Sequence, residues 1–286
     1  MNTCYIPENL TEALEIRRKT HALPLAGGTD LMVQAKQGIG INPVFKSPIM
    51  IITGLDELKG IRVEDDGTLV IGALTTSAEI AADERVFYHI RTAASQMGAI
   101  SLRNTATIGG NIANASPKGD LPQPLILLDA TLTLASLDGE REMKVDDFIT
   151  GAKKTALNDD EIIKEIRVKP VEANYLFYHK IGTRKANAIS KLSLSALANV
   201  KDGLILDFRA SSGAAGDKVK RKREVEEMLI GKAVSDIPSL KDGFLTAWDG
   251  ILSPHAMPTY RRESTKRMLS YFLDKISEGA EPGIIS

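Results

Sequence analysis

Two pairs of adjacent glycines, each beside a hydroxyl and a polar acceptor, constrain this chain more than any other feature. The first pair lies in residues 26–31 (AGGTDL) and the second in residues 107–111 (TIGGN). Glycine has no Cβ, so the backbone at such pairs can take positive φ and approach a ligand closely. Successive free N–H groups in such a turn form a concave site for an anion. The two pairs therefore predict two loops that hold one diphosphate from opposite sides.

The residues around the first pair support a phosphate site. Residues 23–26 form a short apolar strand, the glycines turn the chain, and Thr29 or Asp30 can cap a helix that begins at Leu31. A helix start offers free N–H groups and a partial positive charge. The G-x-G-x-x-G spacing of a Rossmann fold is missing, so that dinucleotide fold is not expected. The alternative interpretation of both pairs is two ordinary tight turns.

Length and charge limit the class of protein. The chain has 286 residues, which favours two domains over one. Its formal net charge is −1, so there is no basic field to support nucleic-acid binding. The longest apolar runs, residues 49–52 and 125–128, are too short for a membrane span, and residues 1–4 lack the character of a signal peptide. We expect a cytoplasmic protein.

Metal and disulfide chemistry have no support within this chain. Cys4 is the only cysteine, so an intramolecular disulfide and an all-cysteine iron–sulfur cluster are excluded. The histidines are scattered and fit no metal-ligand spacing. We also find no Ser/His/Asp or Cys/His arrangement, and no catalytic residue is assigned.

The pattern of apolar residues predicts alternating helices and strands. A capping box at Asn9 predicts a helix to about Lys19, and turn residues predict hairpins between residues 61–71 and around residues 201–203. Residues 101–120 have little periodicity and are expected to be a long loop. Residues 224–230 and 260–276 are expected to be helices. The basic run 218–223 is expected to be a solvated loop and helix start, and residues 278–286 a frayed end.

Together these residues resemble a known family. The chain is similar to the medium, FAD-binding subunit of the xanthine dehydrogenase and carbon monoxide dehydrogenase group of molybdenum hydroxylases. Residues 26–31 and 107–112, continued by residues 115–120 (ASPKGD), carry the resemblance, which extends over essentially the whole length. It implies an α+β protein: an FAD-binding fold of the vanillyl-alcohol oxidase type, with two α/β subdomains, in residues 1–170, followed by a small α+β domain with an antiparallel sheet in residues 174–286.

The resemblance also implies two segments that bind the FAD. The first would wrap the diphosphate and ribityl chain and comprises Pro24, Leu25, Ala26, Gly27, Gly28, Thr29, Asp30 and Leu31. The second would take the other side of the diphosphate through backbone N–H groups and the Thr107 hydroxyl, and comprises Thr107, Ile108, Gly109, Gly110 and Asn111.

Four single positions complete the site that the resemblance implies. Gly98 would line the same cleft, and Ile162 would pack on the flavin. Asp120 would accept a hydrogen bond from a hydroxyl of the ADP ribose, and its alternative role is the N-cap of a helix at Leu121. Lys180 would contact flavin from the second domain, and its alternative is a surface lysine.

The resemblance implies an electron-transfer function. FAD is the implied cofactor of this chain, whereas molybdopterin and two [2Fe–2S] clusters are expected on a large and a small partner subunit. Electrons would pass from the clusters to FAD and on to an acceptor such as NAD. Two alternatives remain: a self-contained FAD-dependent oxidoreductase on the same fold, and a scaffold protein that has lost the flavin.

Overall fold

The N-terminal part of the computed structural model is a small parallel sheet; the structure describes residues 3–36, 38 and 40–285. The strands lie in the order β1-β3-β2 and are β1 (Cys4–Tyr5), β2 (Leu23–Leu25) and β3 (Ile49–Ile51). Helix α1 (Leu10–Thr20) connects β1 to β2. As predicted, Asn9 caps α1, because its Oδ1 accepts from Glu12 N at 2.9 Å. The Glu12 carboxylate reaches back to Glu8 N rather than to Asn9 N.

A five-stranded antiparallel sheet follows, in the order β4-β5-β10-β6-β7. The strands are β4 (Ile61–Val63), β5 (Leu69–Gly72), β6 (Thr131–Ser136), β7 (Gly139–Lys144) and β10 (Ile162–Val168). The predicted hairpin at Asp66-Gly67 is confirmed, since Ile61 pairs with Ile71. A two-stranded ribbon of β8 (Ile149–Gly151) and β9 (Lys154–Thr155) lies between β7 and β10 in the chain, after the short helix α8 (Val145–Phe148).

Short helices connect β5 to β6. They are α3 (Ser77–Ala82), α4 (Tyr88–Ser95), α5 (Ile100–Arg103), α6 (Ile108–Ala113) and α7 (Pro122–Leu127). The expectation of a long loop over residues 101–120 is therefore wrong in part, because α5 ends and α6 lies inside that stretch. Neither helix exceeds six residues, which is too short to leave a helical period in the sequence. Their stability comes from tertiary contacts and from the Thr107 cap of α6.

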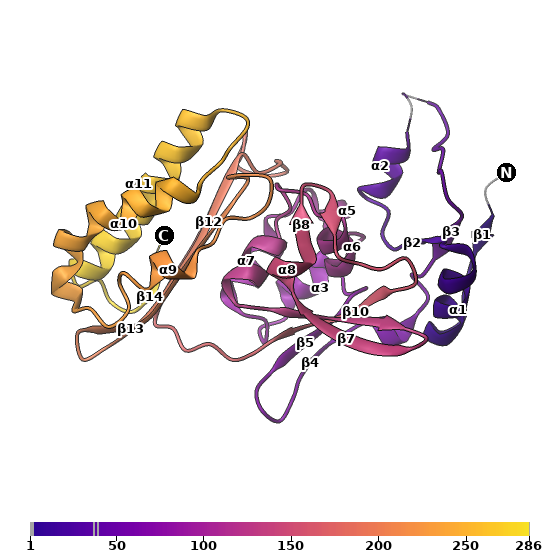
Figure 1. Ribbon diagram of the computed structural model, residues 1–286, viewed down its shortest axis with the longest axis horizontal. Helices are drawn as coiled ribbons and strands as arrows, with labels where there is room; N and C mark the ends of the chain where they lie inside the picture. Colours follow the sequence, from indigo (N-terminus) through magenta and orange to yellow (C-terminus); the bar gives the residue numbers. More distant parts are fainter. Residues whose placement is uncertain (1–2, 37, 39, 286) are drawn as a thin grey trace.

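The C-terminal part is a four-stranded sheet in the order β13-β12-β11-β14, covered on one side by two long helices (Figure 1). Its elements are β11 (Tyr175–Ile181), β12 (Leu192–Lys201), β13 (Leu204–Gly213), α9 (Arg223–Glu226), α10 (Ile237–Ile251), α11 (Pro258–Ser277) and β14 (Gly283–Ile285). Helix α10 was not anticipated. The expectation of a frayed end over residues 278–286 is wrong for residues 283–285, because β14 pairs in parallel with β11; residue 286 lies outside the described residues.

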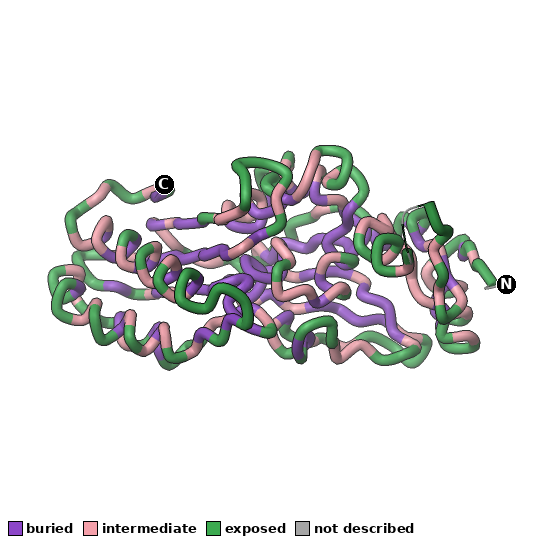
Figure 2. Tube along the Cα trace, turned by 90° about the horizontal axis from the view of Figure 1, so that it is seen from above, coloured by how far each residue is buried: buried purple, intermediate pink, exposed green. Residues whose placement is uncertain are grey.

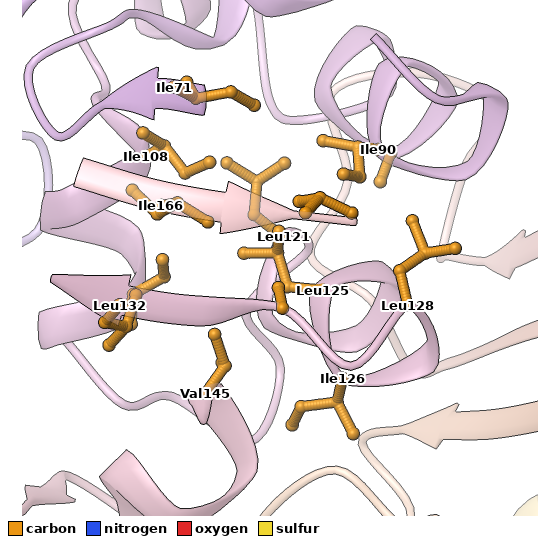
Figure 3. Close-up of a cluster of buried hydrophobic side chains, with 14 of the residues drawn as sticks. Ile71, Ile90, Ile108, Leu121, Leu125, Ile126, Leu128, Leu132, Val145 and Ile166 are labelled. Atoms are coloured by element: carbon orange, nitrogen blue, oxygen red, sulfur yellow. The ribbon is translucent and has the colours of Figure 1, made fainter. Parts of the chain in front are cut away.

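Two large hydrophobic cores stabilise the five-stranded and the four-stranded sheet, and buried segments run through the interior of the molecule (Figure 2). One core packs the five-stranded sheet against α4, α6 and α7, and Ile108, Ile166 and Leu125 converge in it (Figure 3). The other packs the four-stranded sheet against α10 and α11, around Trp248 and Phe208. The first core also takes in Tyr178 and Leu197 from the C-terminal sheet, so the two parts share a packed interface.

Polar contacts fix that interface. Gln123 on α7 donates to Ser211 O at 2.7 Å, and His89 Nε2 on α4 lies 3.0 Å from Ala196 O. The basic run 218–223 was expected to be a solvated loop, and this is wrong for Arg221. Its side chain is 3% exposed and forms an ion pair with Glu226. It also donates to the carbonyls at the end of α7. Arg221 is thus part of the interface, where it supplies hydrogen-bond donors to carbonyl groups at the end of α7.

No helix in the described part of the chain combines the length and the apolar character that crossing a membrane requires.

Candidate functional site: a cavity between two glycine loops

The two glycine segments line one cavity of about 270 Å³. From the predicted site residues the structure brings the following to this cavity: Pro24, Leu25, Ala26, Gly27, Gly28, Thr29, Asp30, Leu31, Thr107, Gly110 and Asn111. Other lining residues were not anticipated: Leu23, Gln34, Met97, Ala106, Ala113, Asn114 and Lys153. The glycine pairs are therefore more than two independent turns, because residues far apart in the sequence form opposite walls of one cavity.

The first segment presents free backbone donors to this cavity. Gly28 has φ of +67°, the left-handed conformation that glycine adopts without strain. Among the described residues, no hydrogen bond engages the N–H groups of residues 27–31. Helix α2 (Leu31–Ala35) that follows has five residues, so its dipole is small and the donors themselves would hold an anion. Asp30 precedes α2, as expected, but makes no side-chain cap hydrogen bond.

Gly27 allows the two walls to approach each other. A Cβ at this position would lie 1.8 Å from the carbonyl oxygen of Thr105, which precedes the second glycine segment. Real Cβ atoms do not come so close to a backbone atom, so any side chain at position 27 would force the walls apart. The cavity therefore depends on glycine here for backbone packing rather than for a special φ.

The second segment is built differently from the expectation. Gly109 and Gly110 lie in helix α6 and have no positive φ, so the expected glycine turn is wrong. Their N–H groups are also occupied: Gly109 N donates to Ala73 O at 2.9 Å and Gly110 N to Thr107 Oγ1 at 3.2 Å. Gly109 is buried against Ala73, whereas Gly110 is exposed and lines the cavity.

This wall can contribute a hydroxyl and a surface of small residues. Thr107 Oγ1 accepts from Gly110 N as the N-cap of α6, so its hydrogen remains free to donate. Asn111 Oδ1 accepts from Leu121 N at 3.2 Å, which leaves the amide nitrogen of Asn111 for another partner. The expected ring of free backbone donors at residues 107–111 is not present.

A second polar cluster lies at the interface with the C-terminal sheet. Lys180 Nζ on β11 is 2.9 Å from Asp120 Oδ1 and 3.0 Å from Gln96 O, next to the lining residue Met97. The two side chains are only 5% and 11% exposed, so Lys180 is not a surface lysine. Asp120 does not cap α7, whose N-cap is Leu121 without a side-chain bond.

Electrostatics at this cluster follow from burial. Desolvation raises the pKa of Asp120, while the ammonium of Lys180 acts in the opposite direction. Burial also raises the pKa of the neighbouring Tyr178 hydroxyl, and the negative charge of Asp120 adds to that effect. The hydroxyl of Tyr178 is buried without a hydrogen-bond partner in the described part of the chain. The cluster therefore holds a carboxylate that burial disfavours and one cation that offsets it.

The structure does not bring every predicted position to the cavity. Gly98 has φ of +46° and follows Met97, but only Met97 lines the cavity. Ile162 is 2% exposed and packs beneath α1 in a small core with Met50 and Leu55. Ile108 and Gly109 are buried behind Thr107. Most lining residues that sequence reasoning missed lie within three residues of a predicted position, and their neighbourhood in the chain was the available signal: Leu23, Gln34, Met97, Ala106, Ala113 and Asn114. Lys153 comes from a distant turn, and nothing in the local sequence indicates it.

Both parts of this fold match families of known proteins. Residues 1–170 match the family described as the FAD binding domain in molybdopterin dehydrogenase. Residues 177–276 match the CO dehydrogenase flavoprotein C-terminal domain. The chain belongs to the family of FAD-binding medium subunits of xanthine and carbon monoxide dehydrogenases, and the predicted fold class is confirmed.

Individual proteins of known name resemble this chain in sequence or in fold. The nicotinate dehydrogenase FAD-subunit of Eubacterium barkeri is 32% identical over 96% of this chain and 97% of its own length. The glyceraldehyde dehydrogenase medium chain of Sulfolobus acidocaldarius is 34% identical over 80% of this chain and 81% of its own. Reconstituted CO dehydrogenase from Oligotropha carboxidovorans has a TM-score of 0.86 over 98% of this chain and 99% of its own, at 22% identity, a likeness of fold.

The prediction of the cofactor and of the enzyme class is confirmed at the level of the family. The chain is an oxidoreductase subunit with an FAD-binding domain. A solved relative, the carbon monoxide dehydrogenase of Hydrogenophaga pseudoflava, is described as a form that lacks the Mo-pyranopterin moiety of its molybdenum cofactor.

Proposed function

We propose that this chain is the electron-transfer subunit that receives electrons from [2Fe–2S] clusters on a small partner subunit and passes them through FAD to a final acceptor such as NAD. The observation that carries the proposal is the cavity between residues 23–34 and 106–114, with the unengaged N–H groups of residues 27–31 along one wall. FAD supplies the redox chemistry when bound, and the protein supplies binding and orientation.

The residues of this cavity fit a dinucleotide diphosphate. The N–H groups of residues 27–31 would donate to phosphate oxygens, and the Thr107 hydroxyl would donate from the opposite wall. Gly110 would leave room for the ligand, because only Thr107 Oγ1 lies within 4 Å of a Cβ built there. Asp120 and Lys180 would bind the cofactor beyond this cavity, at the interface with the C-terminal sheet.

The remaining assignments are proposals of the same kind. The FAD-binding domain would span residues 1–170 and the flavoprotein C-terminal domain residues 174–286, with the change between β10 and β11. The partners would be a large molybdopterin-binding subunit and a small [2Fe–2S] subunit, in a cytoplasmic complex. Support comes from relatives named as medium chains or FAD-subunits of dehydrogenases.

The direct test is to purify the full chain and release its flavin with acid. We expect a yellow protein that yields free FAD, because the described residues that line the cavity include no histidine, cysteine or tyrosine for a covalent flavin bond. Recovery of FMN alone, or of no flavin after addition of FAD, would contradict the binding proposal.

The partner proposal needs a separate experiment. We expect that expression with its genomic neighbours yields a complex containing molybdenum and iron, and that the chain alone oxidises no substrate of that complex. Substrate oxidation by the isolated chain without either metal would instead favour a self-contained flavoenzyme.

A further inference from the structure

Asn114 joins the two walls of the cavity. It is the C-cap of α6, and its Oδ1 accepts from Gln34 Nε2 of α2 at 2.9 Å. The same oxygen accepts from Lys153 Nζ. Gln34, Asn114 and Lys153 all line the cavity. A single carboxamide therefore connects the helix after the first glycine pair, the helix that contains the second pair, and the turn between β8 and β9.

The backbone holds Lys153 in this place. Residues 152–153 form the turn between β8 and β9, and Lys153 has φ of +60°, which is uncommon for a residue with a side chain. Its N–H donates to Ala115 O at 2.8 Å, directly after Asn114. Ala115 is itself buried with φ of +43°. The turn is thus anchored to the end of α6, and the ammonium group reaches Asn114 from there.

Among the described residues, Lys153 forms no ion pair. Among the described residues that line the cavity, Lys153 has the one cationic side chain, and Asp30 the one anionic side chain. The contact of Lys153 with Asn114 is to a neutral amide oxygen. The adjacent Lys154 is also exposed but does not line the cavity. A cation that lines a cavity and has no ion-pair partner among the described residues fits an anionic ligand.

We propose that Lys153, positioned by Asn114, is an additional cofactor-binding residue whose ammonium group neutralises negative charge on the FAD diphosphate held along residues 27–31. This inference rests on the proposed function of the cavity. Asn114 is the positioning residue, because its Oδ1 holds the ammonium group at the cavity and ties Gln34 to the same point. Asn114 thereby links the β8–β9 turn to α2 beside the bound diphosphate.

The test is titration of FAD into the flavin-free full chain, with Lys153→Met, Lys153→Arg and the matched control Lys154→Met. At about 20 mM KCl we expect Lys153→Met to weaken FAD binding about tenfold, the size of one charge-assisted contact of about 1.4 kcal/mol. We expect Lys153→Arg to retain most of the affinity and Lys154→Met to match the wild type. At about 500 mM KCl the difference between wild type and Lys153→Met shrinks, because salt screens the charge.

A second ligand separates charge from structure. ADP carries the diphosphate without the flavin, and riboflavin carries the flavin without a phosphate. We expect Lys153→Met to weaken ADP binding and to leave riboflavin binding unchanged. Equal loss for both ligands would assign Lys153 a structural role and overturn the proposal, as would FAD binding by Lys153→Met at wild-type affinity. A wild type that binds no FAD at all would instead refute the proposed function of the cavity.

Discussion

The two glycine segments have similar sequences and different physical roles. In the first segment, the N–H groups of residues 27–31 are unengaged by the described residues. Residues 107–111 enter a helix, and the N–H groups of Ile108 and Gly109 are used by the carbonyls of Thr75 and Ala73. The first segment is therefore a donor surface, and the second is a packed support that sets the distance to the opposite wall.

The glycines themselves show the same difference. Gly28 uses its conformational freedom, with φ of +67°. Gly27 and Gly109 are needed because another backbone lies where a Cβ would be, whereas a Cβ at Gly110 would meet the Thr107 hydroxyl beside the cavity. A Gly-Gly pair in a sequence therefore does not by itself identify a phosphate loop, since close packing requires the same residue for a different reason.

The largest effect that would break this arrangement is expected at Gly27. We expect Gly27→Ala to lower the free energy of unfolding by about 4 kcal/mol and to abolish FAD binding, because the methyl group collides with Thr105 O. Chemical denaturation and flavin stoichiometry measure the two effects. Gly54→Ala is the control, since nothing lies within 4 Å of a Cβ there. If Gly27→Ala were as stable as the wild type, the close packing of Gly27 against Thr105 O would be contradicted.

The support of the cavity by the C-terminal sheet is tested next, at Lys180. We expect Lys180→Met to lower the free energy of unfolding by about 3 kcal/mol, since it leaves the buried carboxylate of Asp120 without its cation. Adding Asp120→Asn should recover most of this loss, with a coupling of roughly 1–3 kcal/mol in a double-mutant cycle. Additive effects of the two substitutions would mean that the pair is not an energetic unit.

The same pair predicts a direction for the pH dependence. Burial raises the pKa of Asp120 in the folded chain above its ordinary value of 3.8. A carboxyl with a raised pKa stabilises the fold fully below that ordinary value and loses the contribution as the pH rises through the folded pKa. We expect the denaturation midpoint of the wild type to fall relative to that of Asp120→Asn as the pH rises above 3.8, because the other carboxyls titrate in both proteins.

The contrast within the second glycine pair gives a smaller effect. We expect Gly109→Ala to cost about 2 kcal/mol of stability, because its methyl group would lie 2.8 Å from the Cβ of Ala73. Gly110→Ala should cost less stability, because its methyl group would meet only the Thr107 hydroxyl, at 2.9 Å, and it should weaken FAD binding by crowding that hydroxyl at the cavity wall. Denaturation and FAD titration of both variants give the comparison. The reverse pattern would exchange the roles of the two glycines.

Two threonine caps offer the finest comparison. Thr107 caps α6 and Thr76 caps α3, and the two residues face each other in an isolated bridge. We expect valine at either position to cost about 1 kcal/mol of stability, the usual value of an N-cap. Only Thr107→Val should also weaken FAD binding, because Thr107 lines the cavity and Thr76 does not. Equal FAD affinities of the two variants would remove the hydroxyl from the site.

Local patterns in the sequence determined much of this protein. The Asn9 cap, the Asp66-Gly67 and Asp202-Gly203 hairpins and the strand before the first glycine pair were all predicted. Each depends on neighbours within a few residues, such as a turn that needs glycine or a side chain that bonds an N–H three residues on. The resemblance to the family added the FAD cofactor and the α+β fold.

Tertiary structure alone decided the rest. Local sequence patterns do not show that the N–H of Gly109 donates to Ala73 O or that Lys180 forms a buried ion pair with Asp120. They also do not show that the β8–β9 turn brings Lys153 to Asn114. In each case the partners are far apart in the chain, and the free energy comes from burial and packing that exist only when several elements meet. Short helices such as α5 and α6 belong to the same group, because isolated segments of that length are not stable and the surrounding core forms them.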